Sequence, residues 1–381
     1  MPGAKELKEL ADKRSLLGEA RLRKIKKPDC VSAQLRDYQQ AGFNWLATLY
    51  KLQLGGCLAD DMGLGKTLQV LTLLAYARQK SQRKYLTNLV VCPTSLIYNW
   101  RNELEKFTPS LKVKVHYGNN RATQVKDWRQ TDVIITTYGT LANDMEWLRK
   151  FTFHIACLDE SQTIKNPSSL RFKAVSLLKA EHRFVMTGTP IENSTVELFA
   201  QMQFINPGLL GTLTGFKDKF SNHIDTQRNP ALINQLKQLI KPFLLRRTKE
   251  EVATDLPAKT EQVLFCEMGE EQRLVYDSFK QVIRNQLLGL IEQETLEKSK
   301  LSVLEGLTKL RQICDSPALL NAEESLGDQS VKADELVRLI TTKIRDHKAL
   351  VFSQFLGMLD IIEERLRTAD IPYLQLTGRS W

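Results

Sequence analysis

The feature that most constrains the fold is a glycine-containing loop at residues 59–67, which follows a short apolar run and precedes a helix-like sequence. Gly63 and Gly65 allow backbone N–H groups to curl around an anionic oxygen, because no Cβ stands in the way. The helix that follows adds the partial positive charge of its N-terminus. Lys66 can reach the β- and γ-phosphates of a nucleotide, and the hydroxyl of Thr67 can ligate Mg²⁺. The sequence therefore predicts a phosphate-binding loop.

One residue of this loop departs from the usual motif, because Asp60 stands where the first glycine is expected. The alternative is a glycine-rich turn beside a surface lysine, and a Gly-Lys-Thr triplet alone does not separate the two. The strand before the loop and the helix after it favour phosphate binding. We expect a nucleotide to contact Asp61, Met62, Gly63, Leu64, Gly65, Lys66 and Thr67.

Short apolar runs, most of them β-branched, alternate with polar or helical sequence between residues 55 and 205. Such strands indicate a parallel sheet covered on both faces, so we expect an α/β fold. Ligands bind at the carboxyl ends of the strands in such sheets, so the residues that follow the runs are the site candidates. The runs cover residues 88–92, 113–115, 133–136, 154–158 and 184–186.

Two acidic residues, Asp159 and Glu160, directly follow the run at 154–158. Beside a phosphate loop, Asp159 can hold Mg²⁺, often through water, and Glu160 can orient and deprotonate an attacking water. The alternative is a strand-end pair that caps the next helix. Because Lys66 and Thr67 lie upstream, we favour the catalytic role.

Hydroxyl-bearing residues follow three other runs. Thr187 and Thr189 flank Gly188, which permits a tight turn, and their hydroxyls can sense a neighbouring phosphate or acid; in isolation this is an ordinary turn. Two further pairs suit contacts with the sugar-phosphate backbone of a nucleic acid, which position the protein without reading the base sequence. The alternative for both pairs is simple N-capping of a helix. These pairs are Thr94 with Ser95 and Thr137 with Tyr138.

A glutamine, Gln39, stands about twenty residues before the phosphate loop. A glutamine amide can both donate to and accept from a purine edge. Without the loop it would be a polar helix residue, and with the loop it is a candidate adenine reader.

The composition favours a polyanionic partner such as nucleic acid. Lys and Arg number 54 against 44 Asp and Glu, which gives a net charge of +10; a merely basic protein is the alternative. The six cysteines form no CxxC pair and predict buried residues in a reducing compartment, not zinc ligands or disulfides. The first residues lack a signal-peptide pattern and no apolar run approaches membrane-spanning length, so we expect a cytoplasmic protein without a membrane partner.

The sequence predicts four regions along the chain. A solvated helical lead-in precedes the α/β lobe, which ends in a helical insertion; a linker with helices then leads to a second α/β pattern. The regions are 1–30, 31–245 with the insertion at 206–245, 246–332, and 333–381. Further strands are expected at 263–266, 349–352 and 373–376.

The ordered set of motifs resembles the SWI/SNF family of DNA-dependent ATPases, within helicase superfamily two. The match runs from about residue 35 to residue 378. Ala59-Asp60-Asp61-Met62 is typical of this family and accounts for the missing first glycine. The matching segments are 35–39, 58–67, 93–100, 159–162, 164–166, 187–190, 245–249 and 310–314.

This resemblance implies two RecA-like lobes with ATP between them, and movement along double-stranded DNA without strand separation. It implies that Gln39 contacts adenine, that Lys66 and Thr67 hold phosphates and Mg²⁺, and that Asp159 and Glu160 serve Mg²⁺ and water activation. It further implies that Thr187, Gly188 and Thr189 couple hydrolysis to DNA contact. The DNA backbone would be met by Thr94, Ser95, Thr137 and Tyr138 of the first lobe and by Ser353 and Gln354 of the second.

The sequence also departs from the family. The family's second lobe continues past the position of residues 376–378 and supplies a further glycine-containing motif and a motif with arginine fingers, and neither is found here. An arginine finger is worth about 10³ to 10⁵ in rate in related enzymes. We therefore expect a truncated second lobe, with exposed or mispaired strands, in a chain that binds ATP but hydrolyses it poorly.

Three functions stay open at this point. The first is a DNA-stimulated ATPase motor, and the second is an ATP-dependent clamp on DNA or on a transcription complex, with RNA polymerase or another DNA-bound protein as partner. The third, a strand-separating helicase, is disfavoured by Asp60-Asp61-Met62. The Ser161-Gln162 variant of the acidic motif and the compact linker resemble bacterial members, so we expect a monomeric, nucleoid-associated protein.

Overall fold

The computed structural model describes residues 24–378 apart from residues 84, 120, 122–127, 129, 191–193, 254, 256, 258, 294–295, 321–326, 328 and 345–346. Most of the predicted lead-in at residues 1–30 lies outside the described residues. The chain divides into two compact units, Met1–Pro257 and Ala258–Trp381, which are described separately. None of the described helices is long and apolar enough to cross a membrane.

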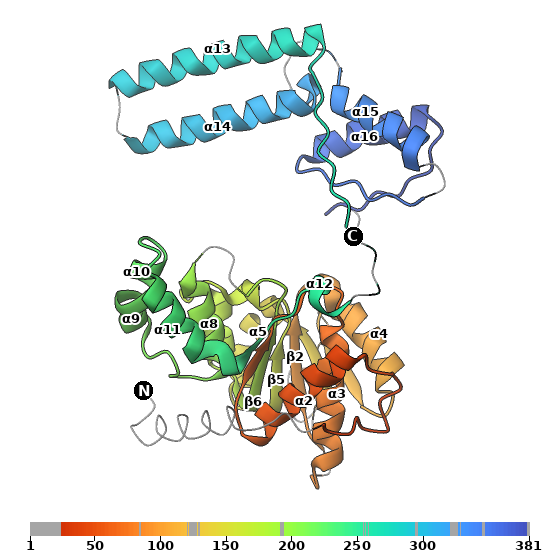
Figure 1. Ribbon diagram of the computed structural model, residues 1–381, viewed down its shortest axis with the longest axis vertical. Helices are drawn as coiled ribbons and strands as arrows, with labels where there is room; N and C mark the ends of the chain where they lie inside the picture. Colours follow the sequence, from red (N-terminus) through yellow and green to blue (C-terminus); the bar gives the residue numbers. More distant parts are fainter. Residues whose placement is uncertain are drawn as a thin grey trace. The chain divides into compact units, whose positions relative to one another are not determined.

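A sheet forms the core of the first unit, and its strands β2, β5 and β6 are labelled in Figure 1. The sheet has seven strands in the order β3-β4-β2-β5-β6-β1-β7. All of its pairings are parallel, as the continuous apolar runs predict. The carboxyl ends of the strands therefore lie along one edge, where the candidate residues gather. The strands are β1 Gly56–Leu58, β2 Asn88–Cys92, β3 Val113–His116, β4 Val133–Thr137, β5 Thr152–Leu158, β6 Lys179–Met186 and β7 Leu244–Leu245.

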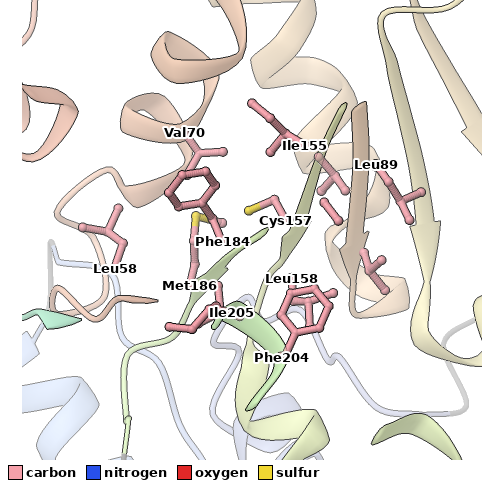
Figure 2. Close-up of a cluster of buried hydrophobic side chains, with 14 of the residues drawn as sticks. Leu58, Val70, Leu89, Ile155, Cys157, Leu158, Phe184, Met186, Phe204 and Ile205 are labelled. Carbon is pink, nitrogen blue, oxygen red and sulfur yellow. The ribbon is translucent and has the colours of Figure 1, made fainter. Parts of the chain in front are cut away.

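Helices pack against this sheet and bury its apolar side chains (Figure 1). Figure 2 shows Val70 of one helix and Phe204 and Ile205 of another in a single cluster with side chains of β1, β5 and β6. This burial holds the strands in register and so fixes the residues that follow them. The helices are α2 Asp37–Lys51, α3 Lys66–Lys80, α4 Ile97–Phe107, α5 Tyr138–Asn143, α6 Met145–Leu148, α7 Leu170–Ser176 and α8 Thr195–Ile205.

The segment expected as a helical insertion contains short helices and then a strand. Its longest helix, α11 (Pro230–Ile240), begins where Asn229 caps the backbone N–H groups of Ala231 and Leu232, with Pro230 in the first turn. The other helices are α9 Leu213–Phe216 and α10 Asn222–Ile224. The segment ends in β7, an edge strand beside β1, and α12 Lys249–Val252 follows. The sequence did not predict β7, because two residues are too few to show a period.

The second unit is helical in its described part. Its helices are α13 Glu270–Gln293, α14 Leu296–Asp315, α15 Val331–Leu339 and α16 Leu356–Thr368, of which α13 and α14 lie side by side (Figure 1). A small cluster of buried side chains joins α15 to α16, namely Ala333, Met358, Ile362 and Leu366.

Three strands predicted in this unit are not formed, at residues 263–266, 349–352 and 373–376. Their apolar side chains are exposed; Phe265 is 93% and Phe352 88% accessible. The prediction was wrong because a strand needs a hydrogen-bonded neighbour and a covered face as well as β-branched residues, and none of the three has a paired neighbour among the described residues.

Candidate nucleotide site

The predicted phosphate loop connects the end of β1 to the start of α3. Gly63 and Gly65 adopt left-handed backbone angles, with φ of 84° and 73°, and Gly65 is the N-cap residue of α3. A side chain at Gly65 would also collide with Gln39, since a Cβ there would lie 2.5 Å from its Nε2. Both glycines are therefore required by backbone geometry. The loop leads directly into a 15-residue helix, whose first backbone N–H groups lack partners within the helix and so suit an anion.

Lys66 lies over the loop that precedes it. Its Nζ donates to the carbonyl oxygens of Asp60 at 2.7 Å and Asp61 at 3.3 Å. Burial lowers the pKa of this lysine, while the carboxylates of Glu160 and Asp159 act in the opposite direction. The ammonium group is thus held over the loop by two carbonyl oxygens, which a phosphate oxygen could replace as hydrogen-bond acceptors.

Gln39 contacts the phosphate loop from the first turn of α2. Its Nε2 donates to the carbonyl of Leu64 at 3.2 Å, and its Oε1 accepts from the backbone N–H of Arg36 at 3.0 Å. The side chain is only 8% exposed. The glutamine therefore lies beside the loop as the sequence suggested, and its amide keeps a second proton and a second lone pair. Contact with adenine stays a prediction.

Asp159 is a buried acid at the carboxyl end of β5, and it is 6% exposed. Its Oδ2 accepts from the indole Nε1 of Trp100 at 2.8 Å, and its Oδ1 accepts from the backbone N–H of Glu160 at 2.9 Å. Its backbone carbonyl accepts from the hydroxyl of Tyr138 at 2.7 Å. Burial raises the pKa of Asp159 to about 6, although the Trp100 hydrogen bond opposes that change. Trp100 was not predicted, and its role follows only from the fold.

Glu160 has a strained backbone, with φ of 48° and ψ of 55°. This left-handed conformation costs a residue other than glycine about 1 to 3 kcal/mol, and such strain gathers at functional sites. Its Oε2 accepts from Nε2 of Gln162 at 2.8 Å, and Oε1 of Gln162 accepts from the Thr187 hydroxyl at 3.0 Å. The backbone N–H of Thr189 donates to that hydroxyl at 3.1 Å. Side chains thus connect the acid after β5 to the turn after β6, and Gln162 is a link that sequence reasoning did not assign.

The residues predicted to contact DNA differ in exposure. Thr94 and Ser95 are exposed in the short helix η1 (Thr94–Leu96) that follows β2. Thr137 is instead the N-cap of α5, accepting from the backbone N–H of Thr140 at 3.1 Å, and Tyr138 is 3% exposed. The N-capping alternative therefore describes the Thr137 side chain, and any DNA contact by this pair would come from backbone N–H groups. That contact stays a prediction.

Ser353 and Gln354 belong to the second unit, before α16. The Ser353 hydroxyl contacts the backbone of Phe355, accepting from its N–H at 3.3 Å. The Gln354 Oε1 accepts from the guanidinium of Arg311 at 2.5 Å. Their predicted contact with DNA remains a prediction.

Arg247 is a third residue of this site, after Trp100 and Gln162, to which the sequence analysis assigned no role. Its Nε donates to Oδ1 of Asp60 at 2.9 Å and its Nη2 donates to Oδ2 at 2.5 Å, while the Asp60 side chain is 0% exposed. Further contacts join this guanidinium to Gln69 and to the carbonyl of Tyr38. The structure therefore places Arg247 in a buried ion pair with Asp60. A buried acid in place of a loop glycine was the signal, since such a charge requires a partner.

Comparisons with known proteins agree with this geometry. A family model described as an SNF2-related domain matches residues 38–319. A Bacillus subtilis protein, YwqA, which carries the provisional name ATP-dependent helicase/translocase, is 37% identical over 98% of this chain and 41% of its own length. The TATA-binding protein-associated factor MOT1 of Saccharomyces cerevisiae is 33% identical over 95% of this chain and 23% of its own length.

A solved structure is also similar. The Sulfolobus solfataricus SWI2/SNF2 ATPase core in complex with dsDNA superposes with a TM-score of 0.59 at 36% identity, over 94% of this chain and 75% of that chain. This likeness gives the first unit a RecA-like α/β fold. The chain spans less than half the length of the two sequence relatives.

Proposed function

The chain belongs to the SNF2-related family, and we propose that it is an ATP-driven motor that moves along double-stranded DNA without separating the strands. One observation carries the proposal. The phosphate loop, the buried Asp159 and the path from Glu160 through Gln162 to Thr187 lie at the carboxyl edge of one parallel sheet. That edge is where such folds bind ligands.

The site's residues suit ATP with Mg²⁺. Lys66 and the N–H groups at the start of α3 would bind the β- and γ-phosphates. Thr67 and Asp159 would hold Mg²⁺, which when bound neutralises charge on the phosphate oxygens. The fit is supported by Asp159 itself, because burial raises the pKa of its carboxyl group even with Lys66 nearby, and a divalent ion would add positive charge that stabilises the ionised form.

Glu160 would act as the base of the reaction. Gln162 occupies one of its carboxylate oxygens, which leaves the other to accept a proton from the attacking water. Because Gln162 also accepts from Thr187, a change at the carboxylate would alter the turn after β6. We propose this path as the start of coupling between hydrolysis and DNA contact.

Double-stranded DNA is the proposed track. The net charge of +10 favours a polyanion, and Thr94 and Ser95 are exposed at the same edge of the sheet as the phosphate loop. The similar archaeal ATPase core was solved with dsDNA, and the yeast relative is named for its association with the TATA-binding protein. We propose that displacement of a DNA-bound protein is the outcome of the movement.

The test is ATP turnover of the chain with and without duplex DNA, compared between the native protein, Glu160→Gln and the exposed control Glu146→Gln. We expect duplex DNA to stimulate turnover, Glu160→Gln to reduce it at least about 100-fold with ATP binding retained, and Glu146→Gln to leave it unchanged. Displacement of a third strand from a DNA triplex, while the duplex stays paired, would show the movement itself.

Other results would point to other functions. Tight ATP-dependent DNA binding without turnover would support a clamp in place of a motor. Separation of the duplex strands would support a helicase. ATP binding that does not change in Lys66→Ala would refute the proposed nucleotide site.

A further inference from the structure

A cluster of polar aromatic and acidic side chains lies at the other end of the sheet from the nucleotide site. His154 is the third residue of β5 and His182 the fourth of β6, and Glu181 precedes His182. Five residues separate His154 from Asp159 along β5, which corresponds to roughly 16 Å at 3.3 Å per residue. The cluster is therefore not part of the phosphate-binding edge.

Hydrogen bonds connect three members of this cluster. The hydroxyl of Tyr50 lies 2.9 Å from Nε2 of His154, and Nδ1 of His154 lies 2.8 Å from Oε2 of Glu181. The other carboxylate oxygen, Oε1, accepts from Arg83 at 2.6 Å. The ring of His182 lies 5.2 Å from that of His154 and 4.3 Å from that of Tyr50. Two imidazoles and a carboxylate thus converge.

His182 is the member whose hydrogen bonding is incomplete. The residue is 8% exposed, and its Nδ1 is buried with no hydrogen-bond partner. Buried polar atoms in folded proteins are nearly always paired, so this nitrogen requires an explanation such as a bound ion.

We propose that His154, Glu181 and His182 bind a divalent transition metal, with Zn²⁺ as the best match. One ligand atom from each of the three lies within 4.8 Å of the others, and no other such group occurs among the described residues. Two imidazole nitrogens and a carboxylate oxygen are a donor set suited to Zn²⁺, Cu²⁺ or Ni²⁺ and unsuited to Mg²⁺ or Ca²⁺. The fourth position falls to water, because the Tyr50 hydroxyl is bonded to the other ring nitrogen of His154.

Binding requires only a small rearrangement. Bonds of about 2.0 to 2.2 Å in a tetrahedral site place the ligand atoms roughly 3.4 Å apart, so a pair at the 4.8 Å limit must close by about 1.4 Å. The metal would replace the hydrogen bond between His154 and Glu181, which frees Nδ1 and Oε2 together. Glu181 is partly exposed and can move, while Arg83 still holds its second oxygen, as outer partners of metal ligands commonly do.

An entry path is present beside the cluster. A polar cavity of about 180 Å³ is lined by Glu181 and His182 together with Gln53, Asn206 and neighbouring backbone. A hydrated ion can therefore reach the buried imidazole from this side. Once bound, it would cross-link β5 to β6, the two strands that carry Asp159 and Thr187 at their far ends.

The experiment is titration of the metal-stripped full chain with Zn²⁺ by calorimetry, and with Co²⁺ by visible absorption. The exposed thiols are removed first by Cys30→Ser and Cys266→Ser, so that they do not bind the metal. We expect one Zn²⁺ per chain, a tetrahedral Co²⁺ spectrum and a higher midpoint of thermal unfolding with Zn²⁺. The variants His182→Ala and His154→Ala should each weaken binding at least about 100-fold.

His223→Ala is the matched control, because His223 is partly exposed and lies in the helical insertion, outside the proposed ligand set. If the alanine variants fail to fold, Glu181→Gln tests the same site through a partly exposed ligand, with folding checked by circular dichroism. Zn²⁺ binding that is equal in His182→Ala, Glu181→Gln and His223→Ala would overturn the proposal. So would the absence of binding to the native chain at micromolar Zn²⁺.

Discussion

Replacing Arg247 by glutamine tests whether the phosphate loop depends on a buried ion pair. The substitution removes the guanidinium that faces Asp60 through two hydrogen bonds. It leaves the Asp60 carboxylate, which is 0% exposed, with Gln69 as its remaining side-chain partner at 3.2 Å. The perturbed group is therefore a carboxylate buried at the start of the phosphate loop and not a surface charge.

The expected loss of stability is large. Removing one partner of a buried ion pair typically costs 3 to 5 kcal/mol, because the other charge stays desolvated. Gln69 offsets part of this, so we expect the free energy of unfolding to fall by about 3 kcal/mol. Asp60→Asn should cost less, since the Arg247 side chain is 13% exposed and keeps its contacts with Gln69 and the Tyr38 carbonyl. The double variant should lose less free energy of unfolding than the sum of the two single losses, and the difference should be roughly 1 to 3 kcal/mol.

The assay is urea unfolding of the full chain followed by tryptophan fluorescence. Four of the five tryptophans belong to the first unit, so the signal reports mainly the unfolding of that unit; they are Trp45, Trp100, Trp128 and Trp147. Arg246→Gln is the control, since that neighbouring side chain is exposed. Equal unfolding midpoints for Arg247→Gln and Arg246→Gln would refute the reasoning, as would strictly additive effects in the double variant.

Three further predictions concern the nucleotide site. Because burial raises the pKa of Asp159 from 3.8 to about 6, the folded state binds the proton more tightly, and ionisation of this residue lowers the free energy of unfolding as pH rises from about 4 to 6. Asp159→Asn should therefore raise the free energy of unfolding at pH 7 by up to about 3 kcal/mol in urea melts without Mg²⁺ and yet abolish ATP turnover. Thr187→Val should reduce DNA-stimulated turnover about tenfold with little change in ATP affinity, because it removes the two hydrogen bonds of the Thr187 hydroxyl, one to Gln162 and one from the backbone N–H of Thr189. A parallel loss of ATP affinity would contradict this. Gly65→Ala should abolish ATP binding, measured with a fluorescent analogue. Gly118→Ala is the control, because Gly118 also has a positive φ of 83° but no atom lies within 4 Å of a Cβ placed there. This control should lower the stability of the fold and leave ATP binding unchanged.

The local sequence pattern predicted the structure correctly where a single short stretch of residues determines it. The run at 88–92 is buried throughout and forms β2 with the same bounds, and the loop glycines have the left-handed angles that phosphate binding needs. Distant partners were not predictable in this way. Arg247 and Asp60 are 187 residues apart, and His154 and His182 appear scattered in the sequence although their rings lie 5.2 Å apart. The run at 349–352 has strand-like residues but no paired neighbour, so pattern alone gave the wrong structure.

The Asp60 position connects the phosphate loop to the segment by which the chain leaves the first unit. The backbone of this segment continues the pairing of β7 along the loop, since Ala59 donates to the carbonyl of Leu245 at 2.7 Å and Asp61 to that of Arg247 at 3.0 Å. A glycine at position 60 would keep these backbone bonds but would leave the Arg247 guanidinium without its carboxylate. With aspartate there, a buried charge pair fixes the loop and the segment to each other. Aspartate gives the backbone at position 60 less conformational freedom than glycine would, but its ion pair with Arg247 holds the loop in place. This ion pair would allow the loop to bind phosphate without its first glycine.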